Sequence, residues 1–265
     1  MKKYLVIGNP IEHSLSPKLH NHWFIKNSLK AFYEKKKINE NDIKVIISEV
    51  KTNKINGINV TVPFKKSVIP FLDELTPLAN ETQSVNTIYK NKNKVIGHNT
   101  DVGGFELSLQ HINYEVKNKK IFILGSGGVV PSIIVALQKM KASKITLSNR
   151  TKEKAEGLKR TLNHDLEILE WGKIPDFDMI INATSLGLKK DDEIKLDYSK
   201  IGQGKLFFDV IYNPSQTKFL LDAKKNGHQI ENGKMMFIYQ AHQAFEIWHK
   251  ISPEINNETI KLLEQ

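Results

Sequence analysis

A strand-like segment near residue 60 ends in side chains that could bind a small polar ligand. Residues 57–62 alternate in polarity and are rich in β-branched residues, so they predict a strand with Asn59 and Thr61 on one face and two valines on the other. Pro63 cannot continue a central ladder, so Lys65 should lie just beyond the carboxyl end of that strand. Small ligands bind at that edge in open α/β sheets, where an amide, a hydroxyl and an ammonium group would meet them. A strand with an ordinary polar face is the simpler alternative.

A glycine-rich turn near residue 125 has the residue types that bind phosphate. The buried-strand pattern of residues 121–124 leads into the sequence Gly-Ser-Gly-Gly at 125–128, and a helix-like segment follows over 129–140. Such a turn offers outward-pointing N–H groups, the positive end of a helix dipole and no obstructing side chains. A tight structural turn explains the glycines equally well when they are taken alone.

The end of the next predicted strand, 145–147, distinguishes between two nicotinamide cofactors. NAD enzymes usually carry an acidic residue there, which binds the ribose 2′-hydroxyl. This chain has Ser-Asn-Arg-Thr at 148–151, followed by Lys154, and these groups favour the 2′-phosphate of NADP. The alternative is that Thr151 is only a helix N-cap and that Arg150 is there by chance.

Further polar side chains stand where strands and helices meet. Ser14 and Ser16 are two residues apart, so both can face one ligand if their loop is extended. Ser16 could instead be the N-cap of a helix that opens with Pro17, and Asp101 could likewise be an N-cap alone. The other candidates are Asn86 at a strand start, Tyr212 after a strand end, and Gln240, which its spacing alone would place on the surface.

Alternating strands and helices, in two series, must hold these groups. The first series predicts strands near 3–8, 31–37, 57–62, 86–90 and 94–98. Its last two strands form a hairpin, so its sheet is mixed. The second series starts near residue 120 and alternates apolar strands with helices, as a parallel sheet requires.

The predicted fold class is α/β with two domains separated by a cleft. An N-terminal mixed α/β domain for the substrate is expected over residues 1–101, completed by C-terminal helices within 235–265. A Rossmann-like NADP-binding domain is expected over residues 102–234.

Composition limits the classes of function. None of the 265 residues is a cysteine, which excludes disulfides, thiolate metal sites and a cysteine nucleophile. The nine histidines lack metal-ligand spacing, so no metal is predicted. No apolar run reaches the about 20 residues of a membrane helix, and the N-terminus leads into a strand without a signal-peptide pattern. A cytoplasmic protein with no membrane partner is therefore expected.

The net charge of +10 raises the question of a nucleic-acid partner. Of 39 basic residues only Arg150 and Arg160 are arginine, the residue best suited to contact bases and phosphates. The lysines are spread along the chain and interleaved with Asn and Glu. This pattern is typical of a solvated surface, and no nucleic-acid partner is predicted.

Ten short motifs occur along the chain in a defined order. In the first domain they are Gly-Asn-Pro-Ile-x-His-Ser-x-Ser-Pro at 8–17, Asn-Val-Thr-Val-Pro-Phe-Lys at 59–65, Val-Asn-Thr at 85–87 and Asn-Thr-Asp at 99–101. Beyond it they are Gly-x-Gly-Gly at 125–128, Asn-Arg-Thr-x-x-Lys at 149–154, Asn-Ala-Thr-Ser-x-Gly at 182–187, Asp-x-x-Tyr-Asn-Pro at 209–214, Gly-x-x-Met at 233–236 and Gln-Ala at 240–241. In order and spacing the chain resembles the shikimate dehydrogenase family over nearly its full length.

The resemblance implies reversible hydride transfer between NADPH and 3-dehydroshikimate, which gives shikimate, in the biosynthesis of chorismate and the aromatic amino acids. It implies that Lys65 transfers the proton, with Asp101 beside it as its partner. The substrate-binding residues that it implies are Ser14, Ser16, Asn59, Thr61, Asn86, Tyr212 and Gln240. The NADP-binding residues that it implies are Gly125, Ser126, Gly127, Gly128, Val129, Asn149, Arg150, Thr151, Lys154, Thr184, Val210 and Gly233.

Two alternative functions would each require a different residue at a known position of the sequence. A quinate/shikimate dehydrogenase that uses NAD should carry an acidic residue at position 149 or 150, where this chain has Asn149 and Arg150. A non-catalytic NADP-binding sensor on the same fold should have lost Lys65 or Asp101, and both are present. The sequence leaves open whether the chain forms a homodimer.

Overall fold

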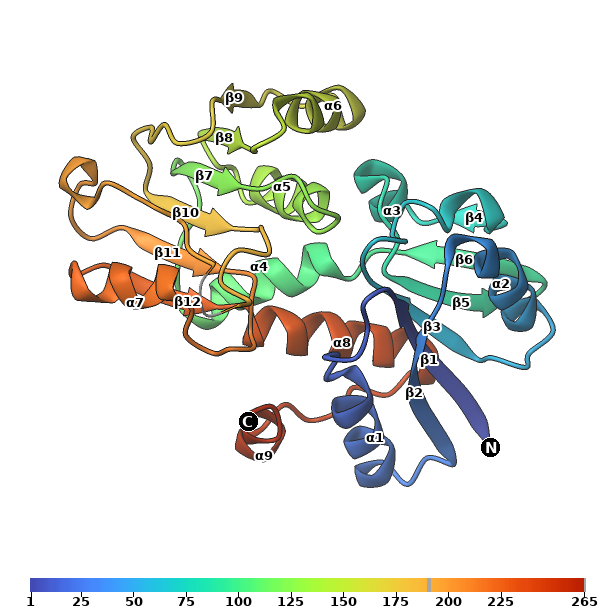
Figure 1. The fold of residues 1–265 in the computed structure, drawn as a ribbon. Helices are drawn as coiled ribbons and strands as arrows, with labels where there is room; N and C mark the ends of the chain where they lie inside the picture. The colour runs from blue at the N-terminus through green and yellow to red at the C-terminus, as the bar shows by residue number, and fades with distance from the viewer. Residues whose placement is uncertain (190–191, 265) are drawn as a thin grey trace. The chain divides into compact units, whose positions relative to one another are not determined.

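The computed structural model describes residues 1–189 and 192–264, and the chain forms two α/β units (Figure 1). One unit combines Met1–Phe105 with the residues from Ile238 onward, and the other is Glu106–Phe237. The units divide inside two helices, α4 (Asp101–His111) and α8 (Lys234–His249). Each unit is built on one six-stranded sheet.

The first unit has a mixed sheet, as the sequence predicts. Its strands lie in the order β2 (Ala31–Lys37), β1 (Lys2–Gly8), β3 (Gly57–Val60), β5 (Thr87–Asn91), β6 (Lys94–His98) and β4 (Glu74–Leu75). β1 pairs in parallel with both β2 and β3, which helical crossovers allow. β5 is antiparallel to both β3 and β6, so the predicted hairpin is confirmed.

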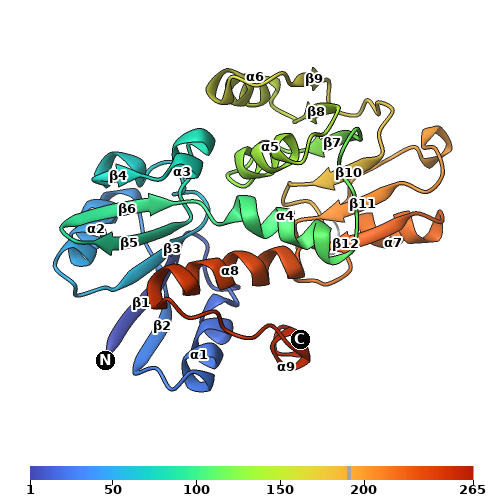
Figure 2. The same ribbon diagram turned by 180° about the vertical axis from the view of Figure 1, so that it is seen from behind.

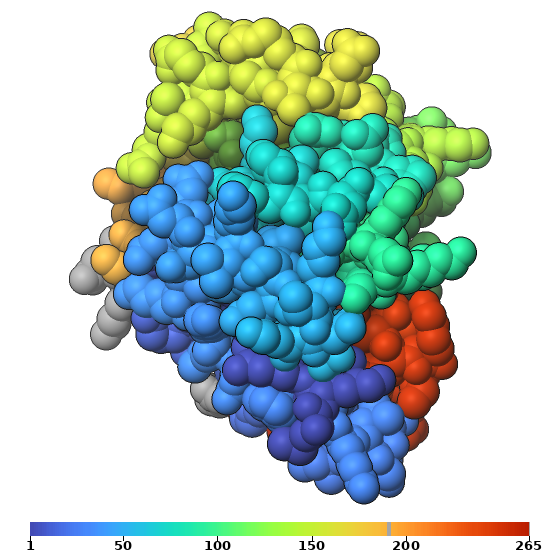
Figure 3. Space-filling view, turned by 90° about the vertical axis from the view of Figure 1, so that its right-hand side faces the viewer, coloured from blue at the N-terminus to red at the C-terminus, as the bar shows by residue number. Residues whose placement is uncertain are grey.

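Two different cores cover the two faces of this sheet. α2 (Ile43–Lys51) buries Ile43, Ile46, Ile47 and Val50 in an aliphatic core that includes alternate residues of β1 and β3. The outer side of α2 and of the chain after it belongs to the surface seen in Figure 3. On the other face lie α1 (Ser16–Lys26) and the C-terminal half of α8 (Figure 2). Rings from these two helices pack against Tyr4 and Tyr33. The remaining helices of this unit are α3 (Pro77–Thr82), α9 (Asn257–Lys261), η1 (Glu40–Asp42) and η2 (Ile69–Phe71).

The second unit has an entirely parallel sheet. Its strands lie in the order β12 (Gln229–Asn232), β11 (Leu206–Asp209), β10 (Met179–Asn182), β7 (Lys120–Leu124), β8 (Lys144–Ser148) and β9 (Glu167–Leu169). The chain winds outward in one direction from β7 and in the other from β10, so the strand order reverses between these two strands. That reversal is the topological switch point at which dinucleotides bind in Rossmann folds. The helices of this unit, besides parts of α4 and α8, are α5 (Val130–Lys139), α6 (Lys152–Leu162), α7 (Lys218–Lys225) and η3 (Tyr198–Lys200).

The predicted strands are present, with differences at their ends and edges. β3 ends at Val60 rather than at residue 62, and Val62 is 48% exposed, so only one of the two valines is buried. The chain turns away at Pro63, which takes the Val62 side chain out of the sheet. β4, β9 and β12 were not predicted, because strands of two to four residues are too short for a clear alternation. The C-terminal helices expected within 235–265 are α8 and α9, and α9 has only five residues.

Neither a membrane-spanning helix nor a metal-binding group of side chains is found among the described residues. Among them, no helix has the length and apolar character that crossing a membrane would require. Nor do the described His, Cys, Asp and Glu side chains form any group of three or more that could hold a metal ion.

Candidate functional site

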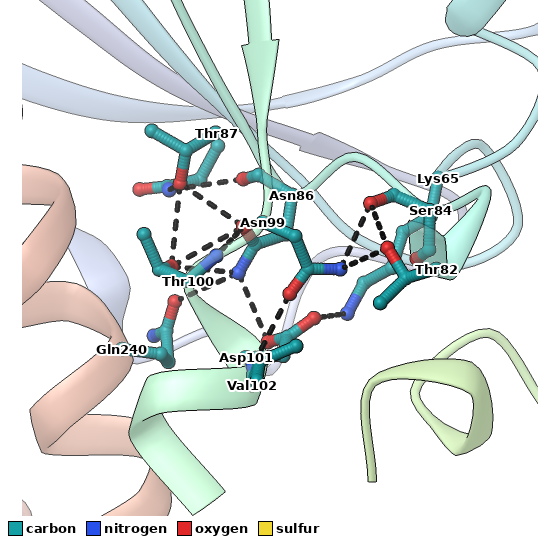
Figure 4. A network of polar contacts seen from close by, with 11 residues as sticks. Lys65, Thr82, Ser84, Asn86, Thr87, Asn99, Thr100, Asp101, Val102 and Gln240 are labelled. Atoms are coloured by element: carbon teal, nitrogen blue, oxygen red, sulfur yellow. Dashed lines mark hydrogen bonds and ion pairs between the residues drawn. The ribbon is translucent and has the colours of Figure 1, made fainter. Parts of the chain in front are cut away.

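A buried ion pair lies at the centre of the polar groups of the first unit. Lys65, in the turn after β3, places its Nζ 2.6 Å from Oδ2 of Asp101, the first residue of α4. The two side chains are only 11% and 8% exposed. Figure 4 shows them pointing toward each other. The structure therefore brings together two residues that lie 36 positions apart in the sequence.

Asn86 holds the other side of the Asp101 carboxylate. Its Nδ2 donates to Asp101 Oδ1 and to Thr100 Oγ1, each at 2.9 Å, and lies 3.4 Å from Gln240 Oε1. Its Oδ1 accepts the backbone N–H of Thr100 at 2.8 Å. Because both oxygens of Asp101 have a donor, the carboxylate has one defined orientation toward Lys65. The network joins four of the residues predicted for the site: Lys65, Asn86, Asp101 and Gln240.

The β5–β6 hairpin explains why these residues meet. Thr87 pairs with His98, so Asn86 and Asn99 stand opposite each other at the open end of the hairpin. The backbone N–H of Asn86 donates to the His98 carbonyl at 3.1 Å. The turn that carries Lys65 is joined to the same end, since the N–H of Val85 donates to the Lys65 carbonyl at 2.8 Å. Backbone pairing thus brings three separate segments to one place.

Asn99, to which the sequence assigned no role, caps α4. Its Oδ1 accepts the N–H of Val102 at 3.2 Å, while its Nδ2 donates to the Ser84 carbonyl at 2.8 Å. The alternative that Asp101 is only an N-cap is therefore wrong, because its carboxylate binds Lys65 and Asn86 instead. The Asn-Thr-Asp motif pointed to this segment, but three polar residues in a row do not show which one caps the helix.

The two serines of the first loop lie side by side. Their hydroxyl oxygens are 3.3 Å apart, and the N–H of Ser16 is 3.4 Å from Ser14 Oγ. Ser16 is the first residue of α1, whose N-cap is Leu15, so the N-cap alternative for Ser16 is also wrong. The hydroxyl pair is consistent with the expectation that both serines face one ligand.

Asn59 and Thr61 differ in their surroundings. Asn59 is buried, and its Nδ2 donates to the Asn86 carbonyl and to Thr87 Oγ1, each at 3.1 Å. Both amide hydrogens are thus committed to the protein, and Asn59 connects β3 to β5. Thr61 is half-buried and lies close to Gly8, where an added Cβ would come within 2.5 Å of Thr61 Cγ2.

The predicted cofactor residues of the second unit gather at one edge of its sheet. A predicted residue follows each of five parallel strands: Gly125 follows β7, Asn149 follows β8, Thr184 is two residues beyond β10, Val210 follows β11 and Gly233 follows β12. Since the carboxyl ends of parallel strands share one edge, these residues line that edge. Tyr212, predicted for the substrate, lies at the same edge and stacks on Phe237 with ring centroids 4.6 Å apart.

Two of these positions require glycine. Gly125 has a φ of +107°, and an added Cβ would lie 2.7 Å from the Ala183 carbonyl oxygen, just after β10. A Cβ at Gly233 would lie 2.2 Å from the Val210 carbonyl oxygen. The turn at 125–129, with Ser126, Gly127, Gly128 and Val129, leads directly into α5, whose N-cap is Val129. This open turn at the switch point fits the pyrophosphate of a dinucleotide.

The segment after β8 exposes its basic residues. Arg150 and Lys154 are exposed, and Asn149 Nδ2 donates to the Thr151 carbonyl at 2.8 Å. Thr151 stands at the N-cap position of α6 but makes no capping hydrogen bond with its side chain. The N-cap alternative is thus right about the position of Thr151, but it does not account for the exposed cationic side chains beside it.

Asp209, at the carboxyl end of β11, should give the protein a specific pH dependence. Burial raises the pKa of its carboxyl from 3.8 to about 6. Because this pKa is raised, the folded state still binds the proton at pH values where the unfolded state has released it. The free energy of unfolding therefore falls as the pH rises from about 4 to about 6. The free energy of unfolding should fall by about 3 kcal/mol over this pH range, from roughly two pKa units at 1.36 kcal/mol each.

Asp209→Asn should abolish that loss. Asn182 Nδ2 and the N–H of Ile211 donate to one oxygen, and Thr217 donates to the other. The Thr217 hydroxyl can turn to accept from an amide, so the substitution keeps the hydrogen bonds. Urea midpoints from pH 4 to 7 check this: the difference between wild type and variant should change across the window. A constant difference would contradict the assignment.

Comparisons with known proteins identify relatives of both units. Residues 6–88 match the model of a shikimate dehydrogenase substrate binding domain, and residues 106–214 match that of shikimate / quinate 5-dehydrogenase. Shikimate dehydrogenase (NADP(+)) of Pelagibacter ubique is 59% identical over 263 residues, which cover 99% of each chain.

Solved structures extend the similarity to the fold. The shikimate dehydrogenase structure from Aquifex aeolicus is 36% identical, with a TM-score of 0.89, over 100% of this chain and 98% of the other. A shikimate 5-dehydrogenase from Thermus thermophilus, solved in complex with NADP(H) and shikimate, is 27% identical with a TM-score of 0.90, over 99% of this chain and 98% of the other. The chain is thus similar to these proteins along its whole length.

Proposed function

The chain belongs to the shikimate dehydrogenase family, and we propose that it reduces 3-dehydroshikimate to shikimate with NADPH, reversibly, in the pathway to chorismate and the aromatic amino acids. The observation that carries the chemistry is the buried Lys65–Asp101 pair, with Nζ and Oδ2 at 2.6 Å. In this proposal the first unit binds the substrate and the second binds NADP(H).

Lys65 is the proton donor for the reduction. Converting a ketone to an alcohol needs a hydride on the carbonyl carbon, which bound NADPH would supply, and a proton on the oxygen. A lysine ammonium can give that proton and offset the negative charge that develops on the oxygen. Asp101 orients the ammonium, and Asn86 orients Asp101 in turn. In the oxidation of shikimate, Lys65 takes the proton back.

The substrate carboxylate is bound by hydroxyl groups rather than by arginine. Both arginines of the chain, Arg150 and Arg160, belong to the second unit, next to and within α6. Ser14 and Ser16, the hydroxyl pair of the first unit, are therefore proposed to contact the carboxylate. Tyr212 is kept as a proposed substrate contact on the family resemblance alone. Thr61, Asn86 and Gln240 are proposed to contact the ring hydroxyls, where each polar contact would penalise a substrate lacking the matching group.

The cofactor is NADP(H), and the residues at the edge of the second sheet fit it. Gly125 lets the turn after β7 pack closely against the Ala183 carbonyl, and a turn of this kind at the start of a helix suits the pyrophosphate. Arg150, Thr151 and Lys154 are proposed to bind the 2′-phosphate. The alternatives are less well supported: an NAD enzyme should carry an acid at 149 or 150, and the intact Lys65–Asp101 pair argues against a non-catalytic sensor.

The direct test is the absorbance of reduced nicotinamide with shikimate and NADP⁺, compared with NAD⁺ and with quinate. We expect turnover with shikimate and NADP⁺, and much slower turnover in the other combinations. Faster turnover with quinate and NAD⁺ would establish the alternative enzyme, and no turnover in any combination would favour the sensor. Light scattering after gel filtration would show whether the chain forms the homodimer left open by its sequence.

Arg150→Ala should weaken the preference for NADP⁺. Losing a charge-assisted contact to a phosphate costs roughly 1.5–3 kcal/mol, so kcat/KM for NADP⁺ should fall about 10- to 100-fold. The value for NAD⁺ should change little, because NAD⁺ lacks the 2′-phosphate. Arg160→Ala is the matched control, since it removes an exposed arginine from α6 itself. Equal losses for both cofactors would count against the assignment of Arg150.

A further inference from the structure

A buried tyrosine connects the serine pair to the Asn86 network. Tyr33, on β2, is 2% exposed, and its hydroxyl donates to Asn59 Oδ1 at 2.7 Å. The Ser16 hydroxyl acts on the same hydroxyl as a hydrogen-bond donor that lowers the Tyr33 pKa, against the larger raising effect of burial. Ser16 in turn lies 3.3 Å from Ser14, measured between hydroxyl oxygens. Tyr33 was not among the residues predicted for the site.

The hydrogens in this chain of contacts can be assigned. Asn59 gives both amide hydrogens to the Asn86 carbonyl and Thr87 Oγ1, so its oxygen must face Tyr33. The single phenolic hydrogen of Tyr33 goes to that oxygen, so Ser16 donates to Tyr33. The result is one continuous path of donors from the serine pair, through Tyr33 and Asn59, to the backbone of Asn86.

Packing holds the Tyr33 ring in place. Tyr33 lies opposite Tyr4 of β1, which lies opposite Gly57 of β3, so the phenol reaches over β1 to the neighbouring strand. His20 of α1 stacks on the ring at 4.4 Å between centroids, with an interplanar angle of 2°. Burial lowers the pKa of His20 to about 3, so this partner stays neutral above acidic pH. The hydroxyl therefore has little freedom to move away from Asn59.

We infer that Tyr33 is a positioning residue for substrate binding: it holds the Ser16 hydroxyl and the Asn59 amide in register, so that the serines and Asn86 contact two parts of one substrate. The inference rests on the proposed function, because it takes the serines and Asn86 as substrate contacts. Tyr33 acts through these residues and takes no part in hydride or proton transfer. Its loss should therefore affect KM for shikimate much more than kcat.

Tyr33→Phe tests the inference, since it removes the hydroxyl and keeps the stacked ring. The buried Asn59 oxygen loses its donor and Ser16 loses its acceptor, so KM for shikimate should rise roughly tenfold. The value of kcat should stay within about threefold, and KM for NADP⁺ should not change. Tyr4→Phe is the matched control, because it removes a buried phenolic hydroxyl from the adjacent strand without taking the donor from Asn59.

A double-mutant cycle and thermal melts complete the test. In an Asn59→Ala background, Tyr33→Phe should raise KM for shikimate less than it does in the wild type. Shikimate should also raise the Tm of Tyr33→Phe less than that of the wild type or Tyr4→Phe, a readout that needs no turnover. An unchanged KM, or equal effects of Tyr33→Phe and Tyr4→Phe, would overturn the inference. A wild type that fails to turn over shikimate would overturn the proposed function instead.

Discussion

Lys65→Met is expected to lower kcat for shikimate oxidation by roughly 10³-fold, within the 10²–10⁴ range of general acid–base catalysis. Methionine keeps an unbranched side chain in the turn after β3 but cannot accept the proton of the substrate hydroxyl. Initial rates with saturating shikimate and NADP⁺ measure the effect. Binding of NADP⁺, followed by fluorescence or calorimetry, should be unchanged, because Lys65 belongs to the first unit and the proposed cofactor residues to the second.

The adjacent lysine supplies the control for Lys65. Lys66 is exposed, whereas Lys65 is buried against Asp101, although both lie in the same turn. Lys66→Met removes the same charge from the next position and should leave kcat within about twofold of the wild type. Equal kcat values for Lys65→Met and wild type would remove Lys65 from the chemistry. Equal losses in both variants would point to the local charge rather than to the buried pair.

Asp101→Asn is expected to reduce both activity and stability. An asparagine has one oxygen and one NH₂ group, while Lys65 and Asn86 both donate to the present carboxylate. Either orientation of the amide therefore places an NH₂ group against a donor. Lys65 would also lose its counter-charge in a buried setting, which costs about 3–5 kcal/mol. The Tm should fall by roughly 6–12 °C or more, and kcat by about 10²-fold.

An exposed ion pair in the same unit is the control for Asp101. Glu74 and Lys94 lie 2.9 Å apart, with side chains 50% and 64% exposed. Glu74→Gln should change stability by about 1 kcal/mol or less, since water and salt already screen this pair. Thermal melts of both variants at two salt concentrations separate the effects. If Asp101→Asn melts at the same temperature as Glu74→Gln, the buried pair does not stabilise the fold.

Local sequence patterns were enough to predict most of the framework. The alternation in β3, the apolar run of β7 and the turn between β5 and β6 each correspond to the predicted element. The glycines after β7 were similarly informative, because Gly125 adopts a φ of +107° that other residues avoid. Backbone sterics and side-chain periodicity act within a few residues, so a single sequence carries their effects directly.

Partner choice among polar side chains could not be predicted in the same way. Ser16 and Asp101 both stand where an N-cap would, yet Leu15 occupies the cap position before α1 and Asn99 caps α4. Asn59 lies on the predicted polar face of its strand, but its amide is committed to neighbours on β5. The partners of Asn59 depend on the register of β5, which is distant from β3 in the sequence.

Sequence patterns alone determined the two α/β series, the glycine turn and the basic segment after β8, and they showed the resemblance to one family. Only the tertiary structure decided that Asp101 binds Lys65, that Asn86 orients Asp101 and that Tyr33 joins Ser16 to Asn59. The physical reason is that a hydrogen bond needs donor and acceptor within about 3 Å and well aligned. Strand pairing, with α4 beginning just after β6, brings Lys65, Asn86 and Asp101 within that distance and places the Tyr33 hydroxyl against Asn59.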